Sequence, residues 1–257
     1  MLPINEIYCG NNIDLIKQLE DNSIDTIITS PPYGDMLGNH YNHVYDFESL
    51  AKEMHRVLKP GGILCWNEKD QHKNGKKTLS PFCHLIYFYN IGLSLWDNII
   101  EYNNNVAPGR FPYYYQAYEN IFILFKGNKI KNVNFLLEIS KTKGQRIKDK
   151  GKNYVRSFDR DYIQSEYRRR HNVWIYDHNS SCLRHMEHEA KMNYRLCADL
   201  INSFSNPNEL ILDPFMGSGT TAIMCKELNR NYIGFEINEK FVIESKKYID
   251  NMQDKLF

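Results

Sequence analysis

The sequence predicts an α/β fold in which a mostly parallel, twisted sheet carries helices on both faces. Short apolar runs alternate along the 257-residue chain with segments whose apolar residues recur at helical spacing. Two of the apolar runs, 24–28 and 210–213, end abruptly in turns that contain Pro or Gly. A hydrophobic content of 42% is enough to form a sizeable core.

The first part of the chain alternates between the two kinds of element. Residues 6–9 and 24–28 are expected strands, and the helical spacing over 13–20 joins them into a parallel strand–helix–strand unit. An amphipathic pattern predicts a helix over 47–58, which Lys59-Pro60-Gly61-Gly62 stops. The next expected elements are a strand at 63–66, a helix at 82–89, and strands at 93–102 and 120–125 that could pair antiparallel.

The last part of the chain repeats the alternation. Apolar runs predict strands at 173–176, 210–213 and 232–235. Apolar residues at helical spacing predict helices at 185–204, 222–228 and 238–252, and Asn238 is the expected cap of the last one.

Positive charge is concentrated in one segment. The whole chain carries a net charge of only +1, but residues 126–170 contain fourteen Lys and Arg against five Asp and Glu, with aromatic residues interleaved. Many such runs are only solvated inserts. A local excess of positive charge in an otherwise neutral protein nevertheless favours a nucleic-acid surface.

The residues that follow strand 24–28 form a stiff segment. We call the residues that directly follow a strand its exit. Ser30-Pro31-Pro32-Tyr33 contains two prolines, which fix two φ angles, remove two backbone donors and keep the preceding residue extended. The exit therefore holds Ser30 and Tyr33 in fixed directions. A rigid loop without a function is the alternative for a Pro-Pro-Tyr stretch considered alone.

The exit of strand 210–213 has the pattern of a nucleotide-binding turn. It leads into Gly217-Ser218-Gly219, a helix, and a strand that ends in Glu236. The third glycine of a dinucleotide fingerprint and the Lys of a phosphate-binding loop are both missing. Asp213 would repel a pyrophosphate but suits a cationic amine, so S-adenosylmethionine, a nucleoside with a charged amino-acid tail, fits best.

The two exits together resemble motifs of the amino-group DNA methyltransferases. Residues 213–221 are similar to the S-adenosylmethionine motif of that family, and Ser30-Pro31-Pro32-Tyr33 is similar to its catalytic motif. The catalytic motif comes first and the basic segment lies between the two, as in the β class of the family. The resemblance covers most of the chain outside 127–170 and implies a Rossmann-like class I methyltransferase core.

The resemblance also implies how the chain is divided. The catalytic half of the core would occupy 1–126, a basic target-recognition region 127–172, and the cofactor-binding half 173–257. The methyl acceptor would be a base flipped out of duplex DNA. Residues Ser30, Pro31, Pro32 and Tyr33 would hold that base, with Tyr33 stacked on it and the Ser30 hydroxyl and Pro31 carbonyl accepting hydrogen bonds from its amine.

The residues implied for S-adenosylmethionine come from several strand ends. Glu236 would bind the ribose hydroxyls, and Phe215 would line the pocket unless it belongs to the core. Asn11 stands where the family often has Asp, and Asp25 is a second candidate near the adenine. The methionine moiety is assigned to Asp213, Gly217, Ser218, Gly219 and Thr220.

The residue that opens the catalytic motif bears on the target base. In the resembled family, Ser goes mainly with cytosine N4, whereas Asp or Asn goes mainly with adenine N6. Ser30 therefore favours N4 methylation of cytosine in double-stranded DNA, and N6 methylation of adenine is the alternative. An RNA methyltransferase and a non-catalytic nucleic-acid-binding module on the same fold are more remote alternatives.

Other features limit the cofactors, partners and location. The six Cys show no CxxC pair or zinc spacing, so no metal site is expected. No signal peptide and no apolar run of membrane-spanning length is present, so a cytoplasmic protein that does not bind membranes is expected. The resemblance leaves open a cognate restriction endonuclease as functional partner, and either a monomer or a homodimer.

Overall fold

The chain folds into two compact units. A computed structural model describes residues 2–32, 45–102, 114, 116–131, 133–141, 143, 146–148, 161–163, 165–176 and 192–253. Unit 1 comprises Met1–Asn134 and Asn172–Phe257, and unit 2 comprises Phe135–His171.

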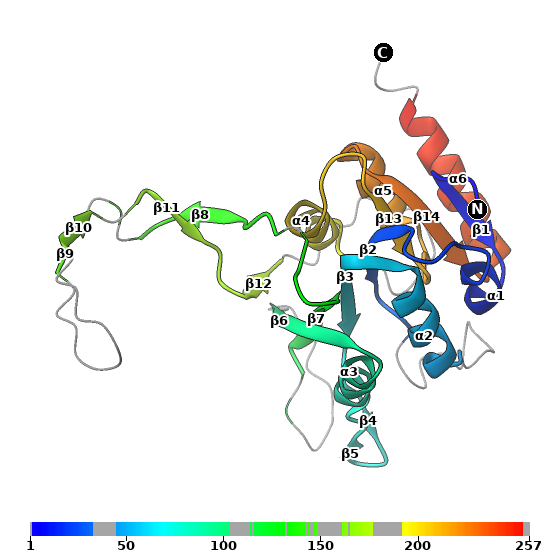
Figure 1. The fold of residues 1–257 in the computed structure, drawn as a ribbon, viewed down its shortest axis with the longest axis horizontal. Coiled ribbons are helices and arrows are strands. Elements are labelled where there is room, and N and C mark those ends of the chain that lie inside the picture. Colours follow the sequence, from blue (N-terminus) through cyan, green and yellow to red (C-terminus); the bar gives the residue numbers. More distant parts are fainter. Residues whose placement is uncertain are drawn as a thin grey trace. The chain divides into compact units, whose positions relative to one another are not determined.

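Unit 1 is built on an eight-stranded sheet with the order β1-β14-β13-β2-β3-β7-β6-β12 (Figure 1). β7 runs antiparallel to both of its neighbours, and every other neighbouring pair in this sheet is parallel, so the expected mostly parallel sheet is confirmed. The strands are β1 (Glu6–Cys9), β2 (Ile24–Thr29), β3 (Leu58–Glu68), β6 (Leu93–Tyr102), β7 (Tyr118–Lys126), β12 (Val173–Ile175), β13 (Leu210–Asp213) and β14 (Asn231–Glu236).

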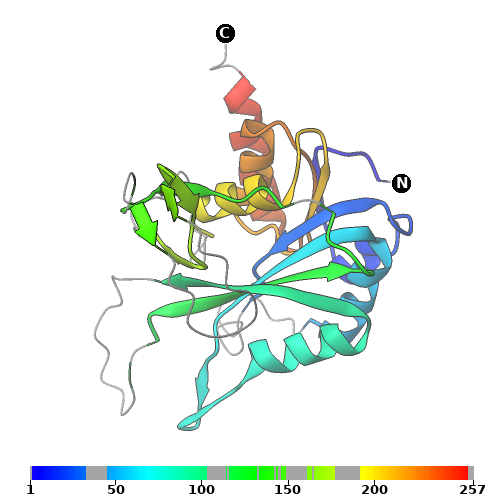
Figure 2. The ribbon, with the colours of Figure 1, turned by 60° about the vertical axis from the view of Figure 1, so that its left-hand side comes forward.

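Helices cover both faces of this sheet (Figure 2). α1, α2 and α3 share one buried cluster with Trp66 and Phe122 of the sheet. α4 and α5 pack on each other, and α4 lies against β2, where Thr26 Oγ1 donates to the Phe204 carbonyl at 2.8 Å. The helices are α1 (Asn12–Ile16), α2 (Phe47–Val57), α3 (Ser80–Asn90), α4 (Tyr194–Phe204), α5 (Thr220–Glu227) and α6 (Glu239–Gln253).

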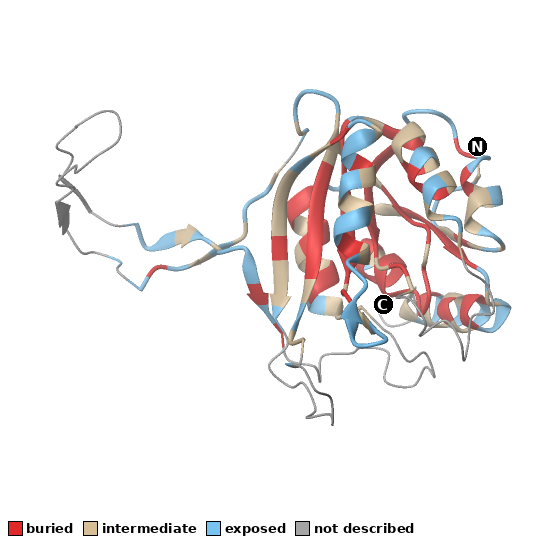
Figure 3. Cartoon of the chain, turned by 90° about the horizontal axis from the view of Figure 1, so that it is seen from below, coloured by how far each residue is buried: buried red, intermediate tan, exposed pale blue. Residues whose placement is uncertain are grey.

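The central strands are buried because helices shield them on both sides, and the polar residues of β2 are buried together with its isoleucines. All six residues of β2 are buried, and Figure 3 shows buried residues along the middle of the sheet. Burial on both faces explains why the strands appear in the sequence as continuous apolar runs rather than as alternating patterns.

The order of strands differs from the simplest strand–helix–strand arrangement. β1 and β2 run parallel as predicted, but β14 and β13 lie between them. The antiparallel pairing predicted for 93–102 and 120–125 is confirmed, with Leu93 opposite Lys126 and Tyr102 opposite Tyr118.

Two helices are shorter than predicted. α1 ends at Ile16 rather than near residue 20, and the Arg56 guanidinium donates to the carbonyls of Ile16 at 3.0 Å and Leu19 at 2.9 Å. α4 begins at Tyr194 rather than at 185, because Asn193 caps it by accepting from the backbone N–H of Arg195 at 2.9 Å. Residues 185–191 lie outside the described part of the chain.

Short two-stranded ribbons complete the structure. Unit 2 contains two antiparallel ribbons, and unit 1 contains a small hairpin between β3 and α3. In unit 2, β8 (Leu137–Ile139) pairs with β11 (Tyr167–Arg169), and β9 (Arg146–Lys148) pairs with β10 (Asp161–Ile163); in unit 1, β4 (His72–Lys73) pairs with β5 (Lys76–Lys77).

Unit 2, which comprises Phe135–His171, is shorter in sequence than the recognition region expected at 127–172. Residues 127–134 belong to unit 1, since the Lys131 N–H donates to the Gly61 carbonyl at 3.0 Å and the Asn134 N–H donates to the Ser203 carbonyl at 2.8 Å. In the described ranges, none of the helices has the length and apolar character needed to cross a membrane.

Candidate active site

The carboxyl ends of β14, β13 and β2 meet at one edge of the sheet. β13 pairs in parallel with β14 on one side and with β2 on the other, where Leu212 lies opposite Ile27. Parallel strands end at the same edge, and ligands of such sheets bind there. The residues that follow β2 and β13 therefore begin side by side at this edge.

Asp213 connects the two exits directly. Its Oδ1 accepts from Thr29 Oγ1 at 2.7 Å and from the Phe215 N–H at 3.0 Å, and its Oδ2 accepts from Thr221 Oγ1 at 2.6 Å. The side chain is only 3% exposed, and burial raises its pKa against the opposing effect of these hydrogen bonds. Three donors of the chain itself bind this carboxylate, so Asp213 positions both exits.

Thr29 and Thr221 were missed as site residues from the sequence. Both are buried polar side chains, and both hydroxyls donate to Asp213. The signal in the sequence was a threonine next to each motif, Thr29 at the end of β2 and Thr221 in the first turn of α5. Neither position indicates by itself which acceptor it would find.

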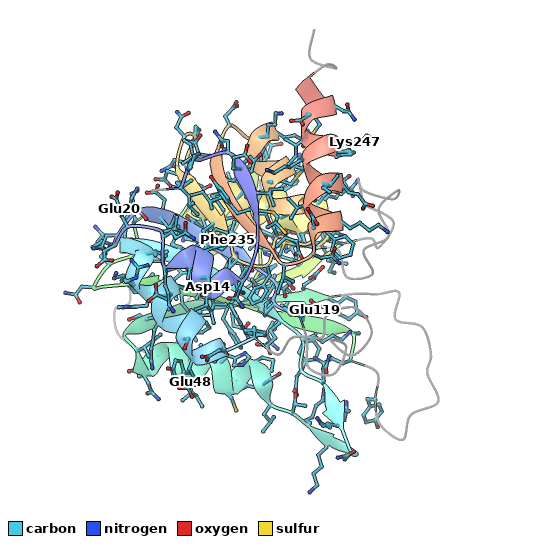
Figure 4. The ribbon with its side chains drawn as sticks, turned by 90° about the vertical axis from the view of Figure 1, so that its right-hand side faces the viewer. Asp14, Glu20, Glu48, Glu119, Phe235 and Lys247 are labelled. Carbon is cyan, nitrogen blue, oxygen red and sulfur yellow. The ribbon has the colours of Figure 1, made fainter. Side chains whose placement is uncertain are left out.

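Glu236 lies at the end of β14, next to the interior residue Phe235 that is labelled in Figure 4. Its Oε2 accepts from the Gly217 N–H at 2.8 Å and its Oε1 from the Asn238 N–H at 2.9 Å. Burial raises the pKa of this carboxyl, although both hydrogen bonds oppose the shift. Each oxygen retains a further lone pair, so the carboxylate can still accept hydroxyl donors of a ligand.

The glycine turn between these acids is tightly packed. Gly219 has a left-handed φ of 82°, and a Cβ built there would lie 2.8 Å from the Ser245 Cβ of α6. Gly217 also has a positive φ, of 52°. Ser218 and Thr220 are buried, and their side-chain oxygens lie 3.3 Å apart. Gly219 therefore allows α6 to approach the turn, which keeps the backbone of the turn compact.

Phe215 lies between the expected pocket and the core. It is partly buried against the hydrophobic cluster, and its ring contacts Tyr45 edge to face with centroids 4.9 Å apart. Both roles considered for Phe215 are thus compatible with its position.

The catalytic motif is described as far as Pro32. Ser30 and Pro32 are half-buried and Pro31 is buried, while Tyr33 lies outside the described residues. Ser30 directly follows Thr29, which pairs with Trp66 of β3. The exit of β3 therefore adjoins the catalytic exit.

The end of β3 supplies polar side chains that sequence reasoning missed. Glu68 is 3% exposed, and its Oε2 accepts from Trp66 Nε1 at 2.9 Å and lies 2.7 Å from His84 Nδ1. Asn67 is equally buried, and its Oδ1 has no hydrogen-bond partner among the described residues. The signal in the sequence was an apolar strand that ends in Asn-Glu beside the catalytic strand.

Asn11 lies at the same edge as Glu236. The Gly10 N–H donates to the Glu236 carbonyl at 2.9 Å, which places the exit of β1 beside that of β14. The Asn11 side chain accepts from the Ile13 N–H at 2.8 Å and so caps α1. A capping role at the carboxyl edge is compatible with the proximity to a ligand expected of Asn11.

Asp25 lies at the opposite edge, since it is the second residue of β2. Its carboxylate accepts from Lys59 Nζ at 2.7 Å, Lys131 Nζ at 2.8 Å and the Leu210 N–H at 3.0 Å. Burial raises the pKa of Asp25, but these three bonds together lower it. Asp25 therefore binds groups at the amino ends of the strands, and its assignment to the adenine stays a prediction.

The carboxyl edge of the sheet, where β13 and β14 end, fits S-adenosylmethionine. Gly217, which has a positive φ of 52°, leaves the backbone of the turn without a side chain at the position whose N–H donates to Glu236. Glu236 offers a fixed carboxylate for a diol. A Rossmann-like sheet with one antiparallel strand, a glycine turn and this acid defines the class of S-adenosylmethionine-dependent methyltransferases.

Within this class the chain belongs to the N6/N4 methyltransferase family described as DNA methylase, whose model matches residues 24–247. The amino-group DNA methyltransferase family predicted from the two motifs is thereby confirmed, and S-adenosylmethionine is its cofactor.

Individual proteins to which the chain is similar are also methyltransferases. The chain is 35% identical over 251 residues to the orphan methyltransferase M.BamHII of Bacillus amyloliquefaciens, covering 93% of this chain and 91% of that one. It is 29% identical over 256 residues to the type II methyltransferase M.HpaI of Haemophilus parainfluenzae, covering 95% and 74%. The solved PvuII DNA methyltransferase (cytosine-N4-specific) has a similar fold, with a TM-score of 0.71, 19% identity, and coverage of 97% and 91%.

Proposed function

We propose that this chain transfers the methyl group of S-adenosylmethionine to the exocyclic N4 amine of a cytosine flipped out of duplex DNA. The observation that carries the proposal is the Asp213 carboxylate, which accepts from Thr29 beside the catalytic motif and from Thr221 beside the glycine turn. The residues that hold the methyl acceptor and those that hold the methyl donor are thereby fixed to one another.

The cofactor side of the site uses the strand exits of β13 and β14. S-adenosylmethionine supplies an activated methyl group on its sulfonium. Glu236 accepts the ribose hydroxyls through the lone pairs that Gly217 and Asn238 leave available. The backbone of the turn from Gly217 to Gly219 faces the methionine moiety, and Asn11 lies on the adenosine side.

The acceptor side uses the rigid exit of β2. Pro31 and Pro32 fix the backbone so that the Ser30 hydroxyl and the Pro31 carbonyl accept hydrogen bonds from the two N–H groups of the target amine. Tyr33 stacks on the flipped base. These contacts direct the nitrogen lone pair toward the methyl group, and a N–C bond forms as the S–C bond breaks and the amine releases one proton. Such a displacement depends on positioning.

Cytosine is the preferred base for two reasons. Ser30 opens the catalytic motif, and Ser at that position goes mainly with cytosine N4 in the resembled family, whereas Asp or Asn goes mainly with adenine. The PvuII enzyme with a similar fold is described as cytosine-N4-specific. Adenine N6 is the second candidate, because the matching family model covers both N6 and N4 methyltransferases.

Unit 2 is the proposed target-recognition region. Residues 135–171 contain eleven Lys and Arg against five Asp and Glu, which suits the phosphates of duplex DNA. A cytoplasmic location is part of this proposal. A restriction endonuclease that cuts the same unmethylated sequence is the proposed functional partner.

Methyl transfer from tritiated S-adenosylmethionine tests the proposed activity. We expect label in duplex DNA and none in RNA. Tyr33→Ala should reduce transfer by at least about a hundredfold while the affinity for S-adenosylmethionine stays nearly unchanged, because stacking holds only the acceptor base. Label in RNA alone would exclude DNA as the substrate, and cofactor binding without transfer to either would indicate a non-catalytic module.

A further inference from the structure

The ribbon formed by β8 and β11 exposes an apolar face. Tyr167 pairs with Ile139 and Arg169 pairs with Leu137, and directly paired residues lie on the same face of a ribbon. Leu137, Ile139 and Tyr167 are 63%, 64% and 53% exposed. We call these four residues the reading face.

The opposite face of the same ribbon is polar and carries an ion pair between its two strands. Arg168 Nη2 lies 2.8 Å from Glu138 Oε1, and both side chains are about one-third exposed, at 34% and 35%. Figure 3 shows the corresponding alternation of exposed and half-buried residues along β8 and β11. The two faces therefore present different chemistry, with an ion pair on one and exposed apolar groups on the other.

Arg169 is held in place on the reading face. Its guanidinium carbon lies 3.8 Å from the centre of the Phe135 ring, a distance at which the cation is attracted to the aromatic face. Stacking orients the planar guanidinium before any ligand arrives, which lowers the entropy lost when it binds.

An exposed apolar face on a ribbon is suited to bind a partner. A two-stranded ribbon is only marginally stable alone, and exposed apolar clusters mark sites of interaction. The strong excess of positive charge in unit 2 indicates a polyanion as the partner. The major groove of B-DNA, about 12 Å wide, admits a two-stranded ribbon, and among the groups that bases display there the thymine methyl is apolar.

We propose that the reading face enters the major groove of the DNA substrate and recognises thymine C5-methyl groups, with Arg169 placed at a neighbouring guanine. Leu137, Ile139 and Tyr167 supply the apolar contacts, and guanine O6 and N7 are the acceptors best suited to an arginine. This inference rests on the proposed function and adds to it the base feature that unit 2 reads.

Replacing thymine by uracil removes only the methyl group and tests the proposal directly. Two duplexes of identical sequence are amplified from one methylatable plasmid, one with dTTP and one with dUTP, and the initial rate of transfer is measured at limiting DNA. We expect kcat/KM to fall about fourfold for each thymine methyl that the face contacts, because the apolar area of that methyl is then no longer buried. Equal rates on the two duplexes would overturn the proposal.

Variants locate the effect within the chain. Leu137→Thr combined with Ile139→Thr keeps strand-forming side chains but removes apolar contact, so this variant should methylate both duplexes at similar rates. Leu95→Thr makes the same kind of change at a 43% exposed position of β6 and should retain the preference for thymine. Should the double variant unfold in a thermal melt, Leu137→Thr alone should weaken the preference.

The remaining outcomes separate this inference from the proposed function. A double variant that keeps the full preference for thymine would show that another part of the chain reads it. A change in sedimentation of the double variant, with the preference unaltered, would show that the face binds a second copy instead. Absence of transfer to either duplex by the unmodified protein would contradict the proposed methyltransferase activity itself.

Discussion

Asp213 is the residue on which the geometry of the site depends most. It is buried at the junction of two strand exits and accepts three hydrogen bonds, one of them from Thr29. A buried polar group that loses its partner costs about 1–3 kcal/mol, so these bonds specify one arrangement of the exits.

Thr29→Val tests this role of Asp213. Valine keeps the branched shape but removes the donor to Oδ1, so we expect a loss of about 1–3 kcal/mol in the free energy of unfolding and at least a tenfold fall in kcat. Thr26→Val is the matched control, because Thr26 is also buried in β2 and donates to the Phe204 carbonyl. It should lose comparable stability with much less effect on kcat, and an equal loss of kcat in both variants would argue against a special role of Thr29.

Glu236 is the residue expected to determine cofactor affinity. Glu236→Gln replaces one acceptor oxygen by an amide that opposes the N–H of Gly217 or Asn238, so the Kd for S-adenosylmethionine should rise about 10- to 100-fold. The measurement is calorimetric titration, with the exposed Glu239→Gln of α6 as control. Since the acceptor side is untouched, kcat at saturating cofactor should change little, and an unchanged Kd would exclude the ribose contact.

Among the elements, β2 has different functions at its two ends. Its carboxyl end leads into the catalytic exit, whereas Asp25 near its amino end binds Lys59 and Lys131. The strand therefore joins the site to a structural ion-pair cluster at the far edge of the sheet. Changes at the two ends should separate activity from stability.

Asp25→Asn should lower stability without affecting the cofactor. Because the folded pKa of Asp25 is lowered, its carboxylate stabilises the protein above its unfolded pKa of about 3.9, and that contribution disappears as the pH falls through the folded value. We expect a loss of about 1–2 kcal/mol in urea denaturation at pH 7, discounted for the partly exposed lysines, and a smaller difference from the unmodified protein near pH 3. A higher Kd of the Asp25→Asn variant for S-adenosylmethionine would instead show that Asp25 contributes to cofactor binding.

The elements also show how much could be predicted from the sequence. The exits after β2 and β13 were predictable because Pro and Gly act locally on the backbone. The hydrogen bond between Thr29 and Asp213 was not, since it depends on β13 and β14 inserting between β1 and β2, which no local pattern records. Asp25 lies at the amino end of a predicted strand, whereas ligands of parallel sheets bind at the carboxyl ends, so strand direction is a signal that disfavours its assignment to the adenine.

At the scale of the whole molecule, the excess of positive charge and the two motifs lie in different units. Unit 1 contains the described residues of both motifs, and unit 2 contains a large excess of Lys and Arg. DNA affinity should therefore depend strongly on salt, whereas cofactor affinity should not, because only DNA binding releases condensed counterions.

Neutralising lysines of unit 2 tests this division. Lys141→Gln with Lys143→Gln should reduce the slope of log K for DNA against log salt by about 0.9 for each phosphate that the variant no longer neutralises, as measured by fluorescence anisotropy. The exposed pair Lys17→Gln and Lys52→Gln in unit 1 is the control. An equal reduction of the slope by both pairs would show that the DNA does not depend on unit 2 for its phosphate contacts.

Mass spectrometry of nucleosides tests the central claim most directly. The protein is incubated with duplex DNA and S-adenosylmethionine that carries a trideuterated methyl group, and the DNA is then digested to nucleosides. Transfer to the exocyclic amine of cytosine predicts trideuterated N4-methyldeoxycytidine as the labelled product. Label in N6-methyldeoxyadenosine would contradict the choice of base, and label in no nucleoside of the DNA would contradict the assignment of the two strand exits as a methyl-transfer site.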